Sequence, residues 1–487
     1  MPPRTEPAAR AGGAARLARQ SAMLAVSGLL ARSAMLLVGF VVARAYGPDE
    51  FGRYTAAFAL ASSFLLFTNL GAGFWLMKLT AQGHTDLDSA YGNALFVTAA
   101  IAAIAFPALI LASHLLGYSP ELRLMVALLG PVVILSSFHE LFSALAQGRG
   151  QMGIIATFRV LYSLALLAAA VIARLVGGTL AFFALLALIL VFVITIAWFI
   201  STLRVARPRL VPSGIPALLR GSWLYGLATL FFVIYFRIDS VMLAIFRTPS
   251  EVGQYGAAYQ VVELLLKVPI LVSFVTLPIA FQVGNSERML DAYRGKLRHL
   301  AVLGMLCSLG VYALADPILH ALVGGRFGPA VAALRILAPA LWIKFVGVAA
   351  ADLLTTSDKQ ARRTILAGLA ALVNIGLNLY LIPHFGIRGA SWATVVTEAL
   401  LAAGFFLSLR TLRVGRVGGP VLLWSALALG AGTATAALLA PEFGVVGSAL
   451  AGMLVTAGVA AATGLLRISD LRALTLPLAG FSRSVSP

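Results

Sequence analysis

Charged side chains inside long apolar runs are the residues of this sequence best suited to chemistry. Six basic residues lie in such runs, and they are Arg32, Arg159, Arg237, Lys267, Arg335 and Lys344. A charge at bilayer depth costs roughly 2.5–3.5 kcal/mol on insertion scales, so each must face a cavity or a partner. Cations in such a setting suit phosphate groups, because arginine offers a planar fork to phosphate oxygens and lysine a compact charge.

Four of these cations are candidates for substrate binding, namely Arg32, Arg237, Lys267 and Lys344. Arg32 and Lys344 lie near the middle of their runs, from where a side chain reaches the membrane surface with difficulty. Arg159 and Arg335 lie nearer the start of a run, where snorkelling or helix-end contacts explain them. We therefore leave those two outside the candidate site.

Two acids near these cations are candidates for binding a coupling proton or sodium ion. Asp239 is two residues from Arg237, so the two side chains point to nearly opposite helix faces and at least one must meet another helix. Glu263 and Lys267 are four residues apart and share a face. This second pair is either self-neutralised or a substrate cation beside an ion-binding acid, and both interpretations stand.

The elements that must position these residues are transmembrane helices. The chain has 487 residues, of which 60% are hydrophobic and 11% charged, and a mean hydropathy of +0.96. A soluble domain carries about 25% charge, so lipid surrounds most of this chain. The apolar runs have the length of a membrane helix and lack the alternation of a β-barrel. The fold class is therefore all-α integral membrane, and the single cysteine, Cys307, forms no disulfide within one chain.

We predict about fourteen spans joined by short loops, none long enough to be a folded extramembrane domain. The predicted spans lie near 21–45, 54–77, 91–116, 123–147, 154–176, 179–203, 222–246, 255–283, 299–323, 329–354, 364–383, 389–409, 419–440 and 444–466. Most of the 36 Lys and Arg residues fall in the two tails and in alternate loops. Basic residues accumulate on the cytoplasmic side, so both termini are expected to be cytoplasmic.

The net charge of +18 follows largely from this topology and attracts anionic lipid headgroups. We expect no nucleic-acid binding, because no soluble module carries a basic patch with interleaved aromatic residues. No catalytic, cofactor or metal site is expected either. The sequence GRGQMG at 148–153 fits GxGxxG but follows no predicted strand. His139-Glu140 begins like the zinc-binding pattern HExxH, but Ser143 stands where the second histidine is required.

One polar turn occurs twice in the chain. Residues 47–58 read GPDEFGRYTAAF and residues 248–259 read TPSEVGQYGAAY, with Pro, Glu, Gly, Tyr and an Ala-Ala pair at corresponding positions. A repeat at this long period indicates two similar halves, an arrangement typical of transporters with alternating access. A second, shorter similarity relates FGIRGASWAT at 385–394 to FGVVGSALAG at 443–452. We interpret each segment as a glycine turn that leads into a span.

These segments carry a resemblance to a known family. ARAYGPDEFGRYTAAFALA at 43–61, RIDSVMLAIFRTPSEVGQYGAAYQVVE at 237–263 and NIGLNLYLIPHFGIRGASWAT at 374–394 resemble the Wzx-type flippases of O-antigen and exopolysaccharide biosynthesis. Those belong to the superfamily that also holds multidrug exporters and lipid II flippases. The resemblance implies two six-helix lobes around a central cavity plus two C-terminal helices. The implied boundaries are 1–20 for a basic tail, 21–205 and 206–415 for the lobes, and 416–487 for the last two spans and the tail.

The resemblance also implies a function. The expected substrate is an undecaprenyl-diphosphate-linked oligosaccharide, flipped across the bacterial inner membrane without an enzymatic step. A polysaccharide polymerase and glycosyltransferases are expected partners. The alternatives are a cation-coupled multidrug exporter, a scramblase, and a membrane glycosyltransferase or ligase acting on the same lipid, which would need a catalytic acid or a sizeable outer loop.

Overall fold

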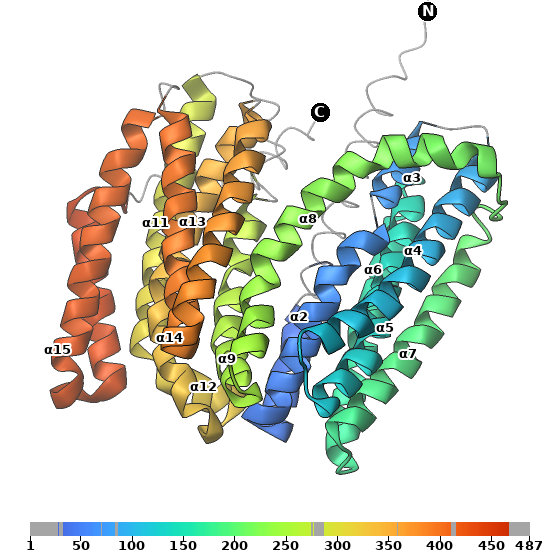
Figure 1. The fold of residues 1–487 in the computed structure, drawn as a ribbon. Coiled ribbons are helices and arrows are strands. Elements are labelled where there is room, and N and C mark those ends of the chain that lie inside the picture. The colour runs from blue at the N-terminus through green and yellow to red at the C-terminus, as the bar shows by residue number, and fades with distance from the viewer. Residues whose placement is uncertain are drawn as a thin grey trace, which may run out of the picture. The chain divides into compact units, whose positions relative to one another are not determined.

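The computed structural model describes residues 28, 33–69, 71–82, 86–273, 276, 287–357, 359–410 and 415–466. Within these residues every regular element is a helix (Figure 1). Eight of their helices are long and apolar enough to cross a membrane, or nine if α11 and α12, which meet at 76°, form one span. The all-α membrane fold is therefore confirmed, whereas the number fourteen and the lobe boundaries stay predictions.

The chain divides into two compact units, Met1–Ala257 and Ala258–Pro487. The described helices of the first unit are the apolar helix Ser33–Tyr46, α2 (Pro48–Asn69), α3 (Ala72–Ala81), α4 (Leu87–Leu115), α5 (Pro120–Gly148), α6 (Met152–Leu175), α7 (Leu180–Thr202), η1 (Pro212–Gly214), α8 (Ile215–Phe246) and the start of α9 (Pro249–Leu265). Helix α5 is central, because α2, α3, α4 and α7 all pack against it.

Local signals in the sequence start these helices. The side chains of Asp86, Ser119 and Thr179 each accept a hydrogen bond from the third backbone N–H that follows, which caps α4, α5 and α7. Tyr91 of α4 and Trp198 of α7 are buried in one apolar core of the first unit. The Tyr91 hydroxyl lies 2.7 Å from the hydroxyl of Thr202 on α7, so the two helices are joined by a polar contact inside an apolar core.

The two copies of the repeated turn meet inside the first unit, at the N-terminal ends of α2 and α9. A Cβ built on Gly52 would collide with the carbonyl of Pro249, and a Cβ on Gly253 would collide with the carbonyl of Pro48. Each built Cβ also lies 3.0 Å from the backbone nitrogen of the other glycine. The contact is thus reciprocal, and only glycine permits two backbones to approach so closely.

The segment that follows α7 is fastened across the start of α4. The backbone N–H of Arg207 donates to Asp88 Oδ1 at 2.8 Å, and the Arg209 guanidinium donates to Asp86 Oδ2 at 3.1 Å. The Val211 N–H donates to Asn93 Oδ1 at 2.9 Å. Hydrogen bonds from Ser89 hold the pKa of Asp86 below its usual value, so this acid stays ionised near neutral pH. We call residues 207–211 the strap.

Replacing Asn93 by alanine should release the strap. Asn93 is buried, and its loss leaves the Val211 N–H without its acceptor, at a cost of about 1–3 kcal/mol. Trypsin cleaves after arginine except where proline follows, as Pro208 follows Arg207, so digestion after Arg209 should become roughly tenfold faster or more, since 1.4 kcal/mol is a factor of ten in the open population.

The matched control for the strap is Ser113→Ala, a buried polar position at the other end of α4. Its hydroxyl donates only locally, to the Ile110 carbonyl. Fragment sizes after limited digestion of the purified protein give the result. Equal cleavage rates in the Asn93 and Ser113 variants would show that the strap is not held by Asn93.

The second unit consists of the rest of α9 and α11 (Glu287–Ala313), α12 (Ala315–Val323), η2 (Gly325–Phe327), α13 (Gly328–Thr356), α14 (Gln360–Leu409) and α15 (Gly415–Ala462). Helix α11 packs against α13 and α15, and α13 packs against α14 (Figure 1). Leu337, Leu341 and Phe345 of α13 are fully buried between these neighbours.

Helices α14 and α15 are each long enough for two spans, and each breaks at one glycine. Gly386 has φ 56° and ψ −134°, and Gly444 has φ 67° and ψ 178°. These are the glycines that follow phenylalanine in the two segments 385–394 and 443–452. Positive φ is the conformation that glycine adopts without penalty. The predicted glycine turns are confirmed.

Candidate functional site

Of the four candidate substrate cations, Arg32 lies outside the described residues. Arg237 lies on α8, and its guanidinium carbon is 5.4 Å from the centre of the Phe58 ring on α2. This is a cation–π contact, which suits a cation in an apolar setting. Asp239, two residues further along α8, is buried and accepts hydrogen bonds from the Tyr255 hydroxyl on α9 and, at 3.0 Å, from the Ser240 N–H.

The first unit therefore separates the arginine and the acid of α8. Arg237 faces α2 and Asp239 faces α9, as expected of residues two apart on a helix. The prediction that at least one of them meets another helix is confirmed. Asp239 is a buried carboxyl with a phenol as its neighbour, so it is a group that can hold a proton or a small cation.

Glu263 and Lys267 form an ion pair in the second unit. Their charged atoms are 3.6 Å apart, and the side chains are 27% and 14% exposed, respectively. The self-neutralised interpretation therefore describes the pair in this conformation. The partial exposure leaves both groups accessible to a ligand.

Lys344 is buried on α13 and is paired with Glu398 on α14. The two side chains are 7% and 8% exposed. The sequence alone does not pair Lys344 with Glu398, which lies in another predicted span. The charge of Lys344 is thus balanced inside the second unit in this conformation.

A further charged cluster was missed in the sequence. Lys296 was expected in a cytoplasmic loop before a span starting near 299, but α11 already begins at Glu287, so Lys296 lies within a helix. Its Nζ is 2.6 Å from Asp352 Oδ2 on α13, 2.7 Å from Thr276 Oγ1 and 3.2 Å from Ser273 Oγ. The signal in the sequence was Asp352, an acid near the end of an apolar run.

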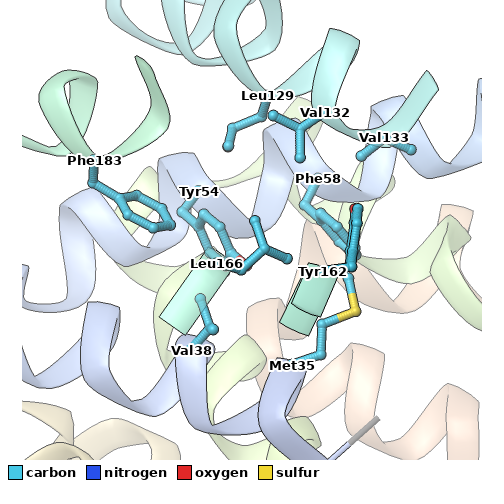
Figure 2. A pocket seen from close by; sticks show the side chains of 10 residues that line it. All are labelled: Met35, Val38, Tyr54, Phe58, Leu129, Val132, Val133, Tyr162, Leu166 and Phe183. Atoms are coloured by element: carbon cyan, nitrogen blue, oxygen red, sulfur yellow. The ribbon is translucent and has the colours of Figure 1, made fainter. Parts of the chain in front are cut away.

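Figure 2 shows a pocket in the first unit that is almost wholly apolar. Its lining comes from Met35, Val38, Tyr54, Phe58, Leu129, Val132, Val133, Tyr162, Leu166 and Phe183. The cavity has a volume of about 20 Å³, which is room for one water molecule. In this conformation it is too small for a sugar.

Residues 17–283 match the family described as polysaccharide biosynthesis protein, which is more than half of the chain. The chain belongs to the polysaccharide biosynthesis protein family. The match includes both copies of the repeated turn and the residues Arg237, Asp239, Glu263 and Lys267. The predicted resemblance is confirmed at the level of this family.

One curated relative of this polysaccharide biosynthesis family member is the probable flippase AglR of Haloferax volcanii. It is 28% identical over 190 residues, which are 37% of this chain and 38% of the relative. The alignment thus spans well under half of the relative it matches.

Solved transporter structures share the fold of this family member. Lipid II flippase MurJ in an inward closed conformation matches with a TM-score of 0.72 and 14% identity, over 90% of this chain and 97% of that one. An inward-facing multidrug resistance MATE family transporter of the MOP superfamily matches with a TM-score of 0.64 and 16% identity, over 79% and 94%. The fold is therefore that of MOP-superfamily transporters.

Among the described residues, no three His, Cys, Asp or Glu side chains gather as metal ligands would. In the second unit the charged groups form cation–acid pairs. In the first unit Arg237 and Asp239 contact different helices.

Proposed function

We propose that this chain is a flippase for an undecaprenyl-diphosphate-linked oligosaccharide. It moves this lipid from the inner to the outer leaflet of a bacterial cytoplasmic membrane by alternating access, as one step of surface polysaccharide biosynthesis. The observation that carries the proposal is that Arg237, Lys267 and Lys344 lie in apolar helical segments of a polysaccharide biosynthesis family member. The relative named probable flippase AglR supports the same reaction class.

The proposed division of roles follows from the contacts. Arg237, Lys267 and Lys344, with Arg32, bind the diphosphate, whose charge needs cations where water is scarce. Lys267 must exchange Glu263 for phosphate oxygens, and Lys344 must do the same with Glu398. Asp239 or Glu263 binds a coupling proton or sodium ion. The sugars stay hydrated in a water-filled cavity while the lipid tail remains in the bilayer.

The proposed location is the inner membrane with both termini in the cytoplasm. The partners are membrane lipids and, in the same biosynthetic route, a polymerase and glycosyltransferases. Such a protein moves its substrate without changing it covalently, so it is not an enzyme.

A cation-coupled drug exporter is the second candidate. One observation favours it, which is the buried acid Asp239 bonded to an aromatic hydroxyl, because an acidic and aromatic site suits cationic drugs. The basic residues in the spans argue against it. Deletion of the gene separates the two functions, with lipid-linked oligosaccharide assayed in each leaflet. Intermediate trapped in the inner leaflet supports the flippase, whereas normal surface polysaccharide with increased drug sensitivity supports the exporter.

Arg237→Ala should lower the rate of flipping by about 10- to 100-fold, since a hydrogen bond to a charged group contributes about 1.5–3 kcal/mol. The flipping rate of Arg237→Lys should lie between those of Arg237→Ala and the native protein, because lysine keeps the charge and loses the planar fork. Translocation of the lipid-linked oligosaccharide in proteoliposomes measures this.

The matched control is Arg335→Ala, an exposed arginine in a span that is outside the candidate site. It should leave the rate within about twofold of the native value, as expected for a surface position. If Arg335→Ala and Arg237→Ala reduce flipping equally at equal protein levels, Arg237 has no specific role.

A further inference from the structure

Lys296 makes more polar contacts than an ion pair alone would explain. Its ammonium group contacts one carboxylate oxygen and two hydroxyl oxygens, from Asp352, Thr276 and Ser273, at 2.6–3.2 Å. An ammonium has three N–H donors, and three acceptors are provided here. The side chains of Lys296 and Asp352 are 10% and 14% exposed, so the group is nearly withdrawn from water.

The three contacts of Lys296 are also the ligands that an alkali cation prefers. Hard cations take oxygen ligands from carboxylates and neutral oxygens. An ammonium group and a potassium ion have similar radii, and the contact distances at Lys296 fall in the range of oxygen contacts to either. The charge also fits, because one carboxylate balances one monovalent cation.

The surroundings do not favour an anion at this place. The donors of Lys296 point at oxygens that are already present, so phosphate would have to displace Asp352. A further cation, Arg363, donates to Thr355 Oγ1 at 2.8 Å. It lies close enough to Asp352 for an electrostatic interaction, and it leaves the contacts of Lys296 unchanged.

We propose that Lys296 is a tethered cation that occupies a monovalent-cation site built from Asp352, Thr276 and Ser273. With its own ammonium group in place, the second unit needs no bound alkali ion there. Removing the side chain beyond Cβ opens the site, and potassium then binds to it. The proposal does not depend on which molecule the protein transports.

The test uses Lys296→Ala in the full-length protein purified in detergent. Thermal unfolding is followed in potassium chloride and in N-methyl-D-glucamine chloride at the same ionic strength. The native protein should unfold at the same temperature in both salts. The variant should unfold about 3 °C higher in potassium at about a hundred times its dissociation constant, since binding only to the folded state stabilises it.

Three further variants make the result specific. Lys296→Met removes the charge but fills the space, so it should show little response to potassium. The double variant Lys296→Ala with Asp352→Asn removes the ligand charge and should lose the response. Arg362→Ala removes an exposed charge close to Arg363 in sequence and should behave as the native protein does.

Two results would overturn the proposal. A potassium response as large in Lys296→Met as in Lys296→Ala would mean that potassium acts elsewhere on the protein, because ionic strength, and so screening, is the same in both salts. Failure to recover folded Lys296→Ala in potassium, while Lys296→Met folds, would mean that the lysine is needed for its bulk rather than for its charge.

Discussion

Lys344→Met should lower the free energy of unfolding by about 3–5 kcal/mol, the largest loss of stability that we expect from a single substitution. The change leaves Glu398 buried without its cation, and removing one partner of a buried ion pair has an effect of this size. Glu398→Gln should be destabilised by a similar amount, since the buried Lys344 then loses the carboxylate with which it pairs. Thermal or denaturant unfolding in detergent measures both.

The double variant Lys344→Met with Glu398→Leu tests whether the pair acts as a unit. Replacing both members of a buried pair by apolar residues is often neutral or stabilising, so stability should return close to the native value. Lys267→Met is the matched control, because its pair with Glu263 is wider and more exposed and should contribute at most about 1 kcal/mol. If the double variant is as unstable as the single ones, the two charges do not depend on each other.

The same double variant also tests the role proposed for Lys344 in transport. A stable protein that no longer flips the lipid would show that the charge of Lys344 is used by the substrate. A stable protein that flips at the native rate would make the pair structural.

Gly52→Ala should be destabilised by about 1–3 kcal/mol or more, and Gly253→Ala by a similar amount. Each added Cβ meets a proline carbonyl of the other turn, so the starts of α2 and α9 must separate. The double variant should lose less than the sum of the single losses, because the first separation already makes room for the second methyl group. Thermal unfolding of the purified variants measures the three effects.

Gly368→Ala is the control for the glycine contact. A Cβ at Gly368 on α14 would meet no atom within 4 Å, and alanine is the better helix former by up to about 1 kcal/mol. This variant should therefore be as stable as the native protein or slightly more so. Full additivity of the Gly52 and Gly253 losses would contradict a shared contact.

The architecture could be predicted from the sequence because lipid imposes a strong length and composition rule. The glycine turns at Gly386 and Gly444 were also predictable, since glycine marks a positive φ. The start of α11 was missed because its first residues are charged, and a span is recognised by its apolar part. Lys296 was therefore placed in a loop, and its cluster was overlooked.

The pairing of distant residues could not be predicted from the sequence. Lys344 and Glu398 are 54 residues apart, and the sequences of their helices do not indicate which helix faces pack against each other. Tyr255 was recognised as part of a repeated motif but not as the partner of Asp239. Residues that face each other across two helices depend on rotations and offsets that the pattern of apolar residues leaves open.

The reciprocal glycine contact has an evolutionary consequence. A contact in which each copy presents the same patch to the other is the isologous contact of a two-fold symmetric dimer, so an ancestral half-length protein could have dimerised through it. Fusion frees the copies to differ. Thr55 now has Gly256 at the corresponding position, and a Cβ built on Gly256 would lie 3.0 Å from the Thr55 hydroxyl oxygen. One copy has the larger side chain where the other has none, a complementarity that two identical subunits cannot evolve.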